Sequence, residues 1–124
     1  MTDLDRLADG KYLLVTTFRK DGRAVPTPVW VVRDGERLLV WTVADSGKVK
    51  RIRNNPRVEV AECDFKGNPT GEAVPATARL LDAEGAERAR KLIRRKYGIS
   101  GTLVVLGSRL RRGAHGTVGI EITV

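Results

Sequence analysis

The first half of the chain alternates between apolar segments and short polar turns, a pattern typical of β-strands. Three segments are rich in apolar and β-branched residues: 11–18, 24–32 and 37–43. Asp34-Gly35, between the second and third of these segments, is a strong β-hairpin signal. The pattern therefore predicts a three-stranded antiparallel meander. Pro26 and Pro28 place the second strand at an edge or a bulge, because proline has no N–H to donate within a sheet.

The second half combines further strand patterns with one long amphipathic helix. Four more segments have strand character: 57–63, 72–81, 102–106 and 117–124. Apolar residues recur at helical spacing within Ala83–Tyr97, and Gly98 is placed to end this helix. The expected fold is mainly β, a small barrel of six or seven antiparallel strands with one long and one short helix. A length of 124 residues suits a single domain over residues 1–124.

The short helix is expected between the third and fourth strands. Asp45 and Ser46 supply an N-cap, and Pro56 stops a helix that extends from about Gly47 to Asn54. Four cations lie within this segment: Lys48, Lys50, Arg51 and Arg53. Their density raises the question of whether the helix holds an anion.

The helical spacing divides these cations into two pairs. At about 100° per residue, Val49 and Ile52 lie on the buried side of the helix. Lys48 and Arg51 then share one flank, and Lys50 and Arg53 share the other. We expect Lys48 to be exposed and to add its ammonium to the free N–H groups and the positive dipole end of the helix, where a phosphate would bind. The alternative is a solvated basic face without a ligand.

Composition extends this picture to the whole chain. The formal net charge of +8 attracts polyanions such as nucleic acids, anionic lipids, and phosphorylated or polycarboxylate ligands. Aromatic residues make up only 5%, too few for base-stacking platforms, so no nucleic-acid partner is expected, although a basic nucleic-acid-binding domain stays an alternative. No apolar run approaches about 18 residues, and the acidic start is no secretory signal, so we expect a cytoplasmic protein without membrane insertion.

Few side chains qualify as catalytic groups. The single cysteine, Cys63, and the single histidine, His115, make no zinc-binding set, so no metal is expected, and both residues are interpreted as structural. The sequence has no Ser-His-Asp set, paired carboxylate site, GxGxxG motif or P-loop. If the chain is an enzyme, a bound cofactor is expected to carry the chemistry, and no catalytic residue is nominated.

Four segments together resemble a known superfamily: 12–17 (YLLVTT), 21–23 (DGR), 27–31 (TPVWV) and 46–56 (SGKVKRIRNNP). They are similar to the flavin and deazaflavin oxidoreductases that have the split β-barrel of pyridoxamine 5′-phosphate oxidase. The similarity is greatest to the branch that uses coenzyme F420, a 5-deazaflavin, and it covers about residues 8–82 well. The resemblance implies a homodimer with cofactor sites at the subunit interface.

The resemblance also implies residues for each part of the cofactor. The ring would lie beside Thr27, Pro28, Val29 and Trp30, with Thr42 nearby. The phosphate of the tail would meet Ser46, Lys48 and Arg51, and Lys50 or Arg53 would be free for the oligoglutamate.

The implied activity is transfer of a hydride from reduced F420 to a small, electron-poor organic acceptor. The alternatives are an FMN-binding reductase or oxidase of the same fold and a non-catalytic F420-binding protein. The arginine-rich segment and the C-terminal Arg/His pair of true pyridoxamine phosphate oxidases are absent, which argues against oxidation of a B6 vitamer.

Overall fold

The computed structural model describes residues 3–43, 46–112 and 117–124, and of residues 43 and 99–112 it describes the backbone alone. The elements, in chain order, are α1 (Asp3–Asp9), β1 (Tyr12–Phe18), β2 (Ala24–Val29), β3 (Val31–Asp34), β4 (Arg37–Val43), α2 (Gly47–Asn54), β5 (Arg57–Cys63), β6 (Val74–Leu80), α3 (Ala83–Arg112) and β7 (Thr117–Thr123).

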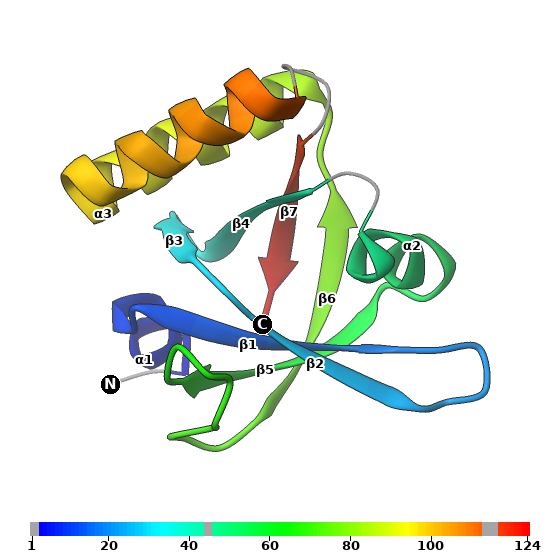
Figure 1. Cartoon of the computed structure of the whole chain (residues 1–124). Helices are drawn as coiled ribbons and strands as arrows, with labels where there is room; N and C mark the ends of the chain where they lie inside the picture. Colours follow the sequence, from blue (N-terminus) through cyan, green and yellow to red (C-terminus); the bar gives the residue numbers. More distant parts are fainter. Residues whose placement is uncertain (1–2, 44–45, 113–116) are drawn as a thin grey trace.

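One antiparallel sheet contains the seven strands of the described chain, in the order β2-β1-β5-β6-β7-β4-β3. The sheet bends strongly, so that β1 and β2 lie crosswise to β6 and β7 (Figure 1). Side chains inside this bend form the main core: Leu13, Val15, Val31, Leu38, Val40, Val58, Val60, Ile120 and Ile122. The predicted fold class, a mainly β, antiparallel split barrel, is confirmed.

The predicted meander is wrong, because its second strand, 24–32, is not continuous but divides into β2 and β3. β1 pairs with β2 and β3 pairs with β4, but β2 and β3 lie at opposite edges of the sheet. The chain crosses from one edge to the other at Trp30, which separates Val29 of β2 from Val31 of β3. The edge position of β2 agrees with Pro26 and Pro28, which cannot donate to a second neighbouring strand.

α3 is a helical hairpin rather than one straight helix. Its first arm ends at Gly98, where φ is 62° and ψ is −136°, a conformation that glycine adopts readily. The expected helix end at Gly98 is therefore confirmed. The second arm returns along the first (Figure 1), so the strand expected at 102–106 is wrong. A short apolar run cannot be assigned to strand or helix by periodicity alone.

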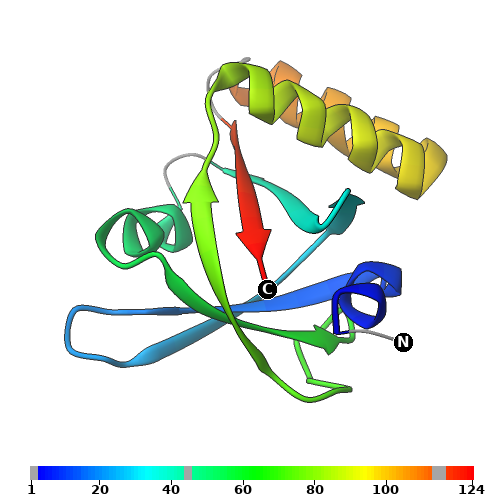
Figure 2. The ribbon, with the colours of Figure 1, turned by 180° about the vertical axis from the view of Figure 1, so that it is seen from behind.

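Two short helices lie at opposite ends of the barrel (Figure 2). α2 contacts β1 and β6 at one end, and α1 contacts β5 at the other. The sequence analysis missed α1, although Leu4, Leu7 and Ala8 have helical spacing and pack into the core. Asp3 and Asp5 lie in its first turn, where the helix dipole favours negative charge.

Candidate functional site

α2 begins with a capped first turn, as predicted. Ser46 Oγ accepts a hydrogen bond from the N–H of Val49 at 3.4 Å. Val49 and Ile52 are buried against the barrel, with 0% and 3% of their surface exposed. The amides of Gly47 and Lys48 find no acceptor among residues 3–43, 46–112 and 117–124. These N–H groups lie where the helix dipole favours an anion.

Lys48 is buried, which corrects the expectation that it is exposed. Only 7% of its surface is accessible, and its Nζ donates to Thr42 Oγ1 at 2.9 Å. Thr42 continues the face of β4 that carries the core residues Leu38 and Val40, so the ammonium lies at one end of the barrel core. Burial, followed by the positive charge of Arg51, lowers the pKa of Lys48 below its usual value.

Arg51 is oriented by a buried threonine. Its Nε donates to Thr17 Oγ1 at 2.6 Å, and the Thr17 hydroxyl donates in turn to the carbonyl of Val25 at 3.5 Å. This bond uses one of five guanidinium donors and leaves those on the Nη atoms for other acceptors. Burial and the nearby charge of Arg19 lower the pKa of Arg51. Lys48 and Arg51 thus each bond to a threonine of the barrel.

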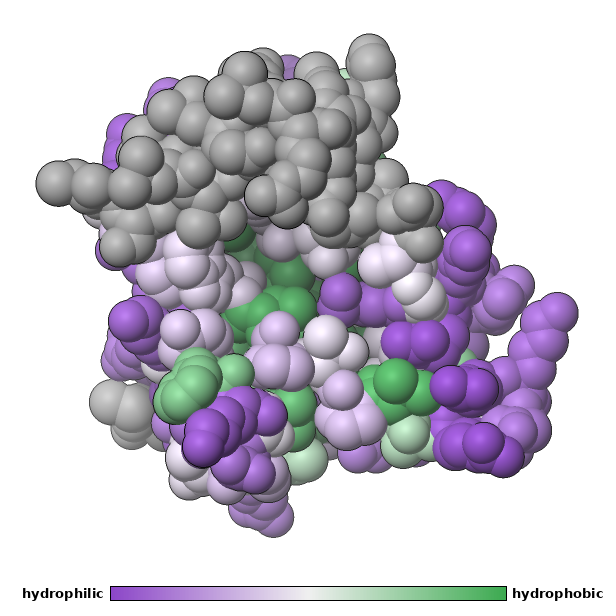
Figure 3. Space-filling model, viewed as in Figure 1, coloured by the Kyte–Doolittle hydropathy of each residue, from purple (hydrophilic) through white to green (hydrophobic). Residues whose placement is uncertain are grey.

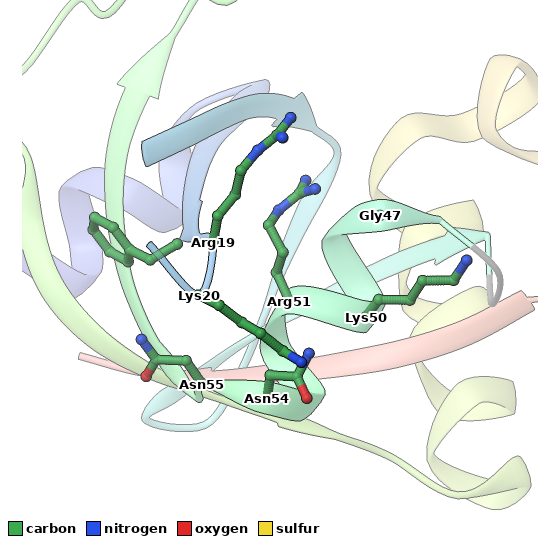
Figure 4. Close-up of a pocket in the computed structure, with 8 residues that line it drawn as sticks. Arg19, Lys20, Gly47, Lys50, Arg51, Asn54 and Asn55 are labelled. Atoms are coloured by element: carbon green, nitrogen blue, oxygen red, sulfur yellow. The ribbon is translucent and has the colours of Figure 1, made fainter. Parts of the chain in front are cut away.

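A pocket of about 570 Å³ lies between α2 and the turn that follows β1 (Figure 4). It is lined by Phe18, Arg19, Lys20, Gly47, Lys50, Arg51, Asn54 and Asn55. Four of these lining residues are cations and none is acidic. Figure 4 shows Arg19 and Arg51 extending side by side, whereas Lys50 points away from them. The pocket is therefore strongly basic.

The structure divides the four helix cations differently from the predicted pairs. Lys50 and Arg51 line the pocket, and Lys48 points towards Thr42. Arg53 is exposed and does not line the pocket. The sequence analysis missed the two basic residues of the β1–β2 turn, because its pattern indicates only a turn. Nothing local in the sequence shows that this turn folds back towards α2.

The predicted ring-binding residues follow β2 away from the pocket. Thr27, Pro28 and Val29 pair with β1 and are half-buried. β2 begins at Ala24, which pairs with the pocket residue Phe18, and its six residues span about 20 Å. On the face seen in Figure 3, hydrophobic residues gather at the centre and hydrophilic residues gather on the side of α2 and the β1–β2 turn. β2 therefore connects the basic pocket with the predicted ring-binding segment.

Trp30 stacks on an anchored tyrosine at the end of β2. The rings of Trp30 and Tyr97 are parallel within 8°, with centroids 4.3 Å apart. The Tyr97 hydroxyl donates to the carbonyl of Lys11 at 2.6 Å and accepts from the N–H of Val31 at 3.2 Å. Both rings help to line a second pocket of about 480 Å³, together with Asp9, Lys11, Tyr12 and Lys96.

The remaining candidates carry no chemistry in the described part of the chain. Cys63 is buried at the end of β5, and burial raises the pKa of its thiol. His115 lies outside the described residues. No group of three or more His, Cys, Asp or Glu side chains that could hold a metal occurs among the described residues. No helix within the described ranges is long and apolar enough to span a membrane.

A bent antiparallel sheet whose two edges are joined through Trp30 defines a split β-barrel. The chain belongs to the pyridoxamine 5′-phosphate oxidase family, whose model matches residues 4–124. The search of curated proteins found no match.

Several solved structures share the fold. A conserved hypothetical protein from Mycobacterium tuberculosis is 19% identical, with a TM-score of 0.74 over 100% of this chain and 81% of that one. A structure named F420 reductase is 21% identical, with a TM-score of 0.62 over 99% and 94% of the two chains. An F420-H2-dependent reductase is also 21% identical, with a TM-score of 0.63 over 90% and 93%.

Proposed function

We propose that the protein is an F420-dependent oxidoreductase that passes a hydride from the reduced deazaflavin to a small, electron-poor organic acceptor. The observation that carries this proposal is a basic pocket, with no carboxylate among its lining residues, at the beginning of β2, the strand that leads to Trp30. Two comparisons support it. The chain belongs to the pyridoxamine 5′-phosphate oxidase family, and its fold is similar to that of two structures named as F420 reductases. The proposed assembly is a homodimer with the cofactor at the subunit interface.

The residues present fit the anionic part of such a cofactor. The amides of Gly47 and Lys48, which find no acceptor among the described residues, and the Nη groups of Arg51 would hold its phosphoryl group. Lys50 would meet a carboxylate of the oligoglutamate. A Cβ built on Gly47 would lie 2.7 Å from Arg51 Nη1. Glycine at the helix start therefore leaves the room that this guanidinium occupies.

The remaining proposed contacts concern the ring. Thr27, Pro28, Val29 and Trp30 would lie beside it, with Thr42 nearby. When bound, reduced F420 supplies a hydride to the acceptor, which takes its proton from solvent. The chain contributes positioning and exclusion of water, and the stack of Trp30 on Tyr97 limits the freedom of the indole ring. No side chain is assigned as a proton donor.

Titration with F420, FMN and a random DNA duplex tests the proposal. We expect F420 to bind most tightly, and reduced F420 to be oxidised when a quinone or enone is added. Arg51→Gln should weaken F420 binding about tenfold or more, because a charge-assisted hydrogen bond is lost. Arg95→Gln, an exposed residue of α3, is the control and should bind normally.

Three other outcomes would contradict the proposal, and each would identify a different function. Tight binding of FMN without F420 would identify a flavin enzyme of the same fold. Binding of F420 without turnover of any acceptor would identify a cofactor-binding protein. A preference for the duplex that falls steeply with salt would identify a nucleic-acid-binding domain.

A further inference from the structure

The cations of the pocket lack the carboxylate partners that most other described arginines have. Eight arginines form ion pairs with N···O distances of 3.7 Å or less: Arg6, Arg23, Arg33, Arg37, Arg57, Arg79, Arg88 and Arg90. None of the four pocket cations, Arg19, Lys20, Lys50 and Arg51, pairs with a carboxylate among the described residues. Within the part of the chain that the structure describes, carboxylates thus pair with arginines elsewhere and not with this group.

Asp21, the carboxylate next in sequence to Arg19 and Lys20, is already engaged. Asp21 Oδ1 accepts from the backbone N–H of Arg23 at 3.0 Å, and its Oδ2 lies 3.6 Å from the Arg23 guanidinium. Two backbone bonds close the same turn, from Arg19 N–H to the Arg23 carbonyl and from Gly22 N–H to the Arg19 carbonyl, both at 2.9 Å. This turn therefore presents Arg19 and Lys20 to the pocket without a carboxylate partner among the described residues.

The two arginines of the pocket repel each other unless an anion lies between them. Arg19 and Arg51 extend side by side in Figure 4, and burial followed by the charge of Arg19 lowers the pKa of Arg51. The bond from Arg51 Nε to Thr17 limits how far this guanidinium can retreat. An anion between the two groups would convert this repulsion into two charge-assisted contacts.

We infer that this pocket takes a second anionic group of the ligand, bound by Arg19 and Lys20, so that the protein selects polyanionic ligands over a single phosphate. The inference rests on the proposed function and adds two binding residues to its site. One phosphoryl group carries a charge of at most about −2, whereas the pocket presents four cations. Its volume of about 570 Å³ leaves room for the further group.

Arg53 provides a matched control for this inference. It lies on the same helix as Arg51, is exposed, has no ion-pair partner among the described residues and does not line the pocket. Arg19→Gln and Arg53→Gln remove the same charge from the same end of the protein. A long-range electrostatic effect would therefore weaken anion binding equally in both variants, whereas direct contact would weaken it only in Arg19→Gln.

The experiment is calorimetric titration at fixed ionic strength with inorganic tripolyphosphate and with orthophosphate. We expect the wild type to bind tripolyphosphate at least about tenfold more tightly than orthophosphate, Arg19→Gln to lose about tenfold in tripolyphosphate affinity, and Arg53→Gln to lose less than about twofold. Lys20→Gln repeats the test should Arg19→Gln not fold. Equal affinity for the two anions, or equal losses at Arg19 and Arg53, overturns the inference.

A second titration distinguishes failure of this inference from failure of the proposed function. F420 with its glutamates and F420 lacking them are titrated into the wild type and Arg19→Gln, and we expect the variant to lose affinity mainly for the glutamylated form. If tripolyphosphate binds through Arg19 and neither form of F420 binds, the proposed function fails and the inference holds. If both forms bind the two proteins equally, the inference fails and the proposed function holds.

Discussion

Replacing Lys48 with methionine tests whether its buried charge serves stability or binding. Lys48 is 7% exposed, and its described hydrogen-bond partner is the hydroxyl of Thr42, at 2.9 Å. Methionine fills a similar space without the charge. Losing a hydrogen bond from a charged donor costs about 1.5–3 kcal/mol, but the desolvation penalty of a buried ion is several kcal/mol. We therefore expect the free energy of unfolding of Lys48→Met at pH 7 to equal that of the wild type or to exceed it by about 1–3 kcal/mol.

The pH dependence of the same comparison has a defined sign. Burial lowers the pKa of Lys48 in the folded protein below its value of 10.5 in the unfolded chain. Between the lowered pKa and 10.5 the unfolded state binds more protons than the folded state, so stability rises with pH. Below the lowered pKa, Lys48 is protonated in both the folded and the unfolded state, and the desolvation penalty of its buried ammonium is fully present. The wild type should therefore gain stability relative to Lys48→Met as the pH rises through this window.

Urea unfolding of both proteins at pH 7, 8, 9 and 10 measures these quantities, and F420 or tripolyphosphate titration measures binding. We expect weaker anion binding in Lys48→Met, because Lys48 is the second residue of α2 and its charge adds to the positive potential at the helix start. A loss of more than about 2 kcal/mol in Lys48→Met, with the same pH slope as the wild type, would refute the reasoning. It would mean that the charge of Lys48 stabilises the fold.

Two further variants probe the supports of the site. Gly47→Ala should displace the Arg51 guanidinium, whose Nη1 lies 2.7 Å from the added Cβ, and should weaken tripolyphosphate binding several-fold in calorimetry. Its stability should change by less than about 1 kcal/mol, because alanine favours a helix and the side chain that must move is flexible. Tyr97→Phe should lower the free energy of unfolding in urea by about 1–3 kcal/mol, because the N–H of Val31 loses its acceptor. An unchanged midpoint in Tyr97→Phe would show that this amide finds another partner.

The local features of the fold could be predicted from the sequence. The boundaries of α2 follow from the cap at Ser46 and the proline at position 56, and the edge position of β2 follows from its prolines. Both signals act within a few residues. The pairing of β3 with β4 was likewise visible in the turn at Asp34-Gly35.

Long-range arrangements could not be predicted in the same way. The placement of β2 and β3 at opposite edges depends on closure of the whole barrel, which no local pattern encodes. Residues 102–106 carry strand-forming side chains, but they lie in the second arm of α3 because Gly98 reverses the helix. The periodicity of α2 placed Lys48 on a flank, and only the position of β4 decides that this flank faces Thr42.

The net charge of +8 acts mainly where carboxylates are missing. Glu121 bonds to both Arg37 and Arg79, and Asp34 bonds to Arg88, so these carboxylates cancel part of the positive potential at these places. The cations of the pocket have no carboxylate partner among the described residues, so they repel one another and lower the stability of the folded state. An anionic ligand that binds there at 100 times its Kd would raise that stability by about 2.7 kcal/mol. These charges thus lower the stability of the protein without ligand, and the same charges would couple ligand binding to folding.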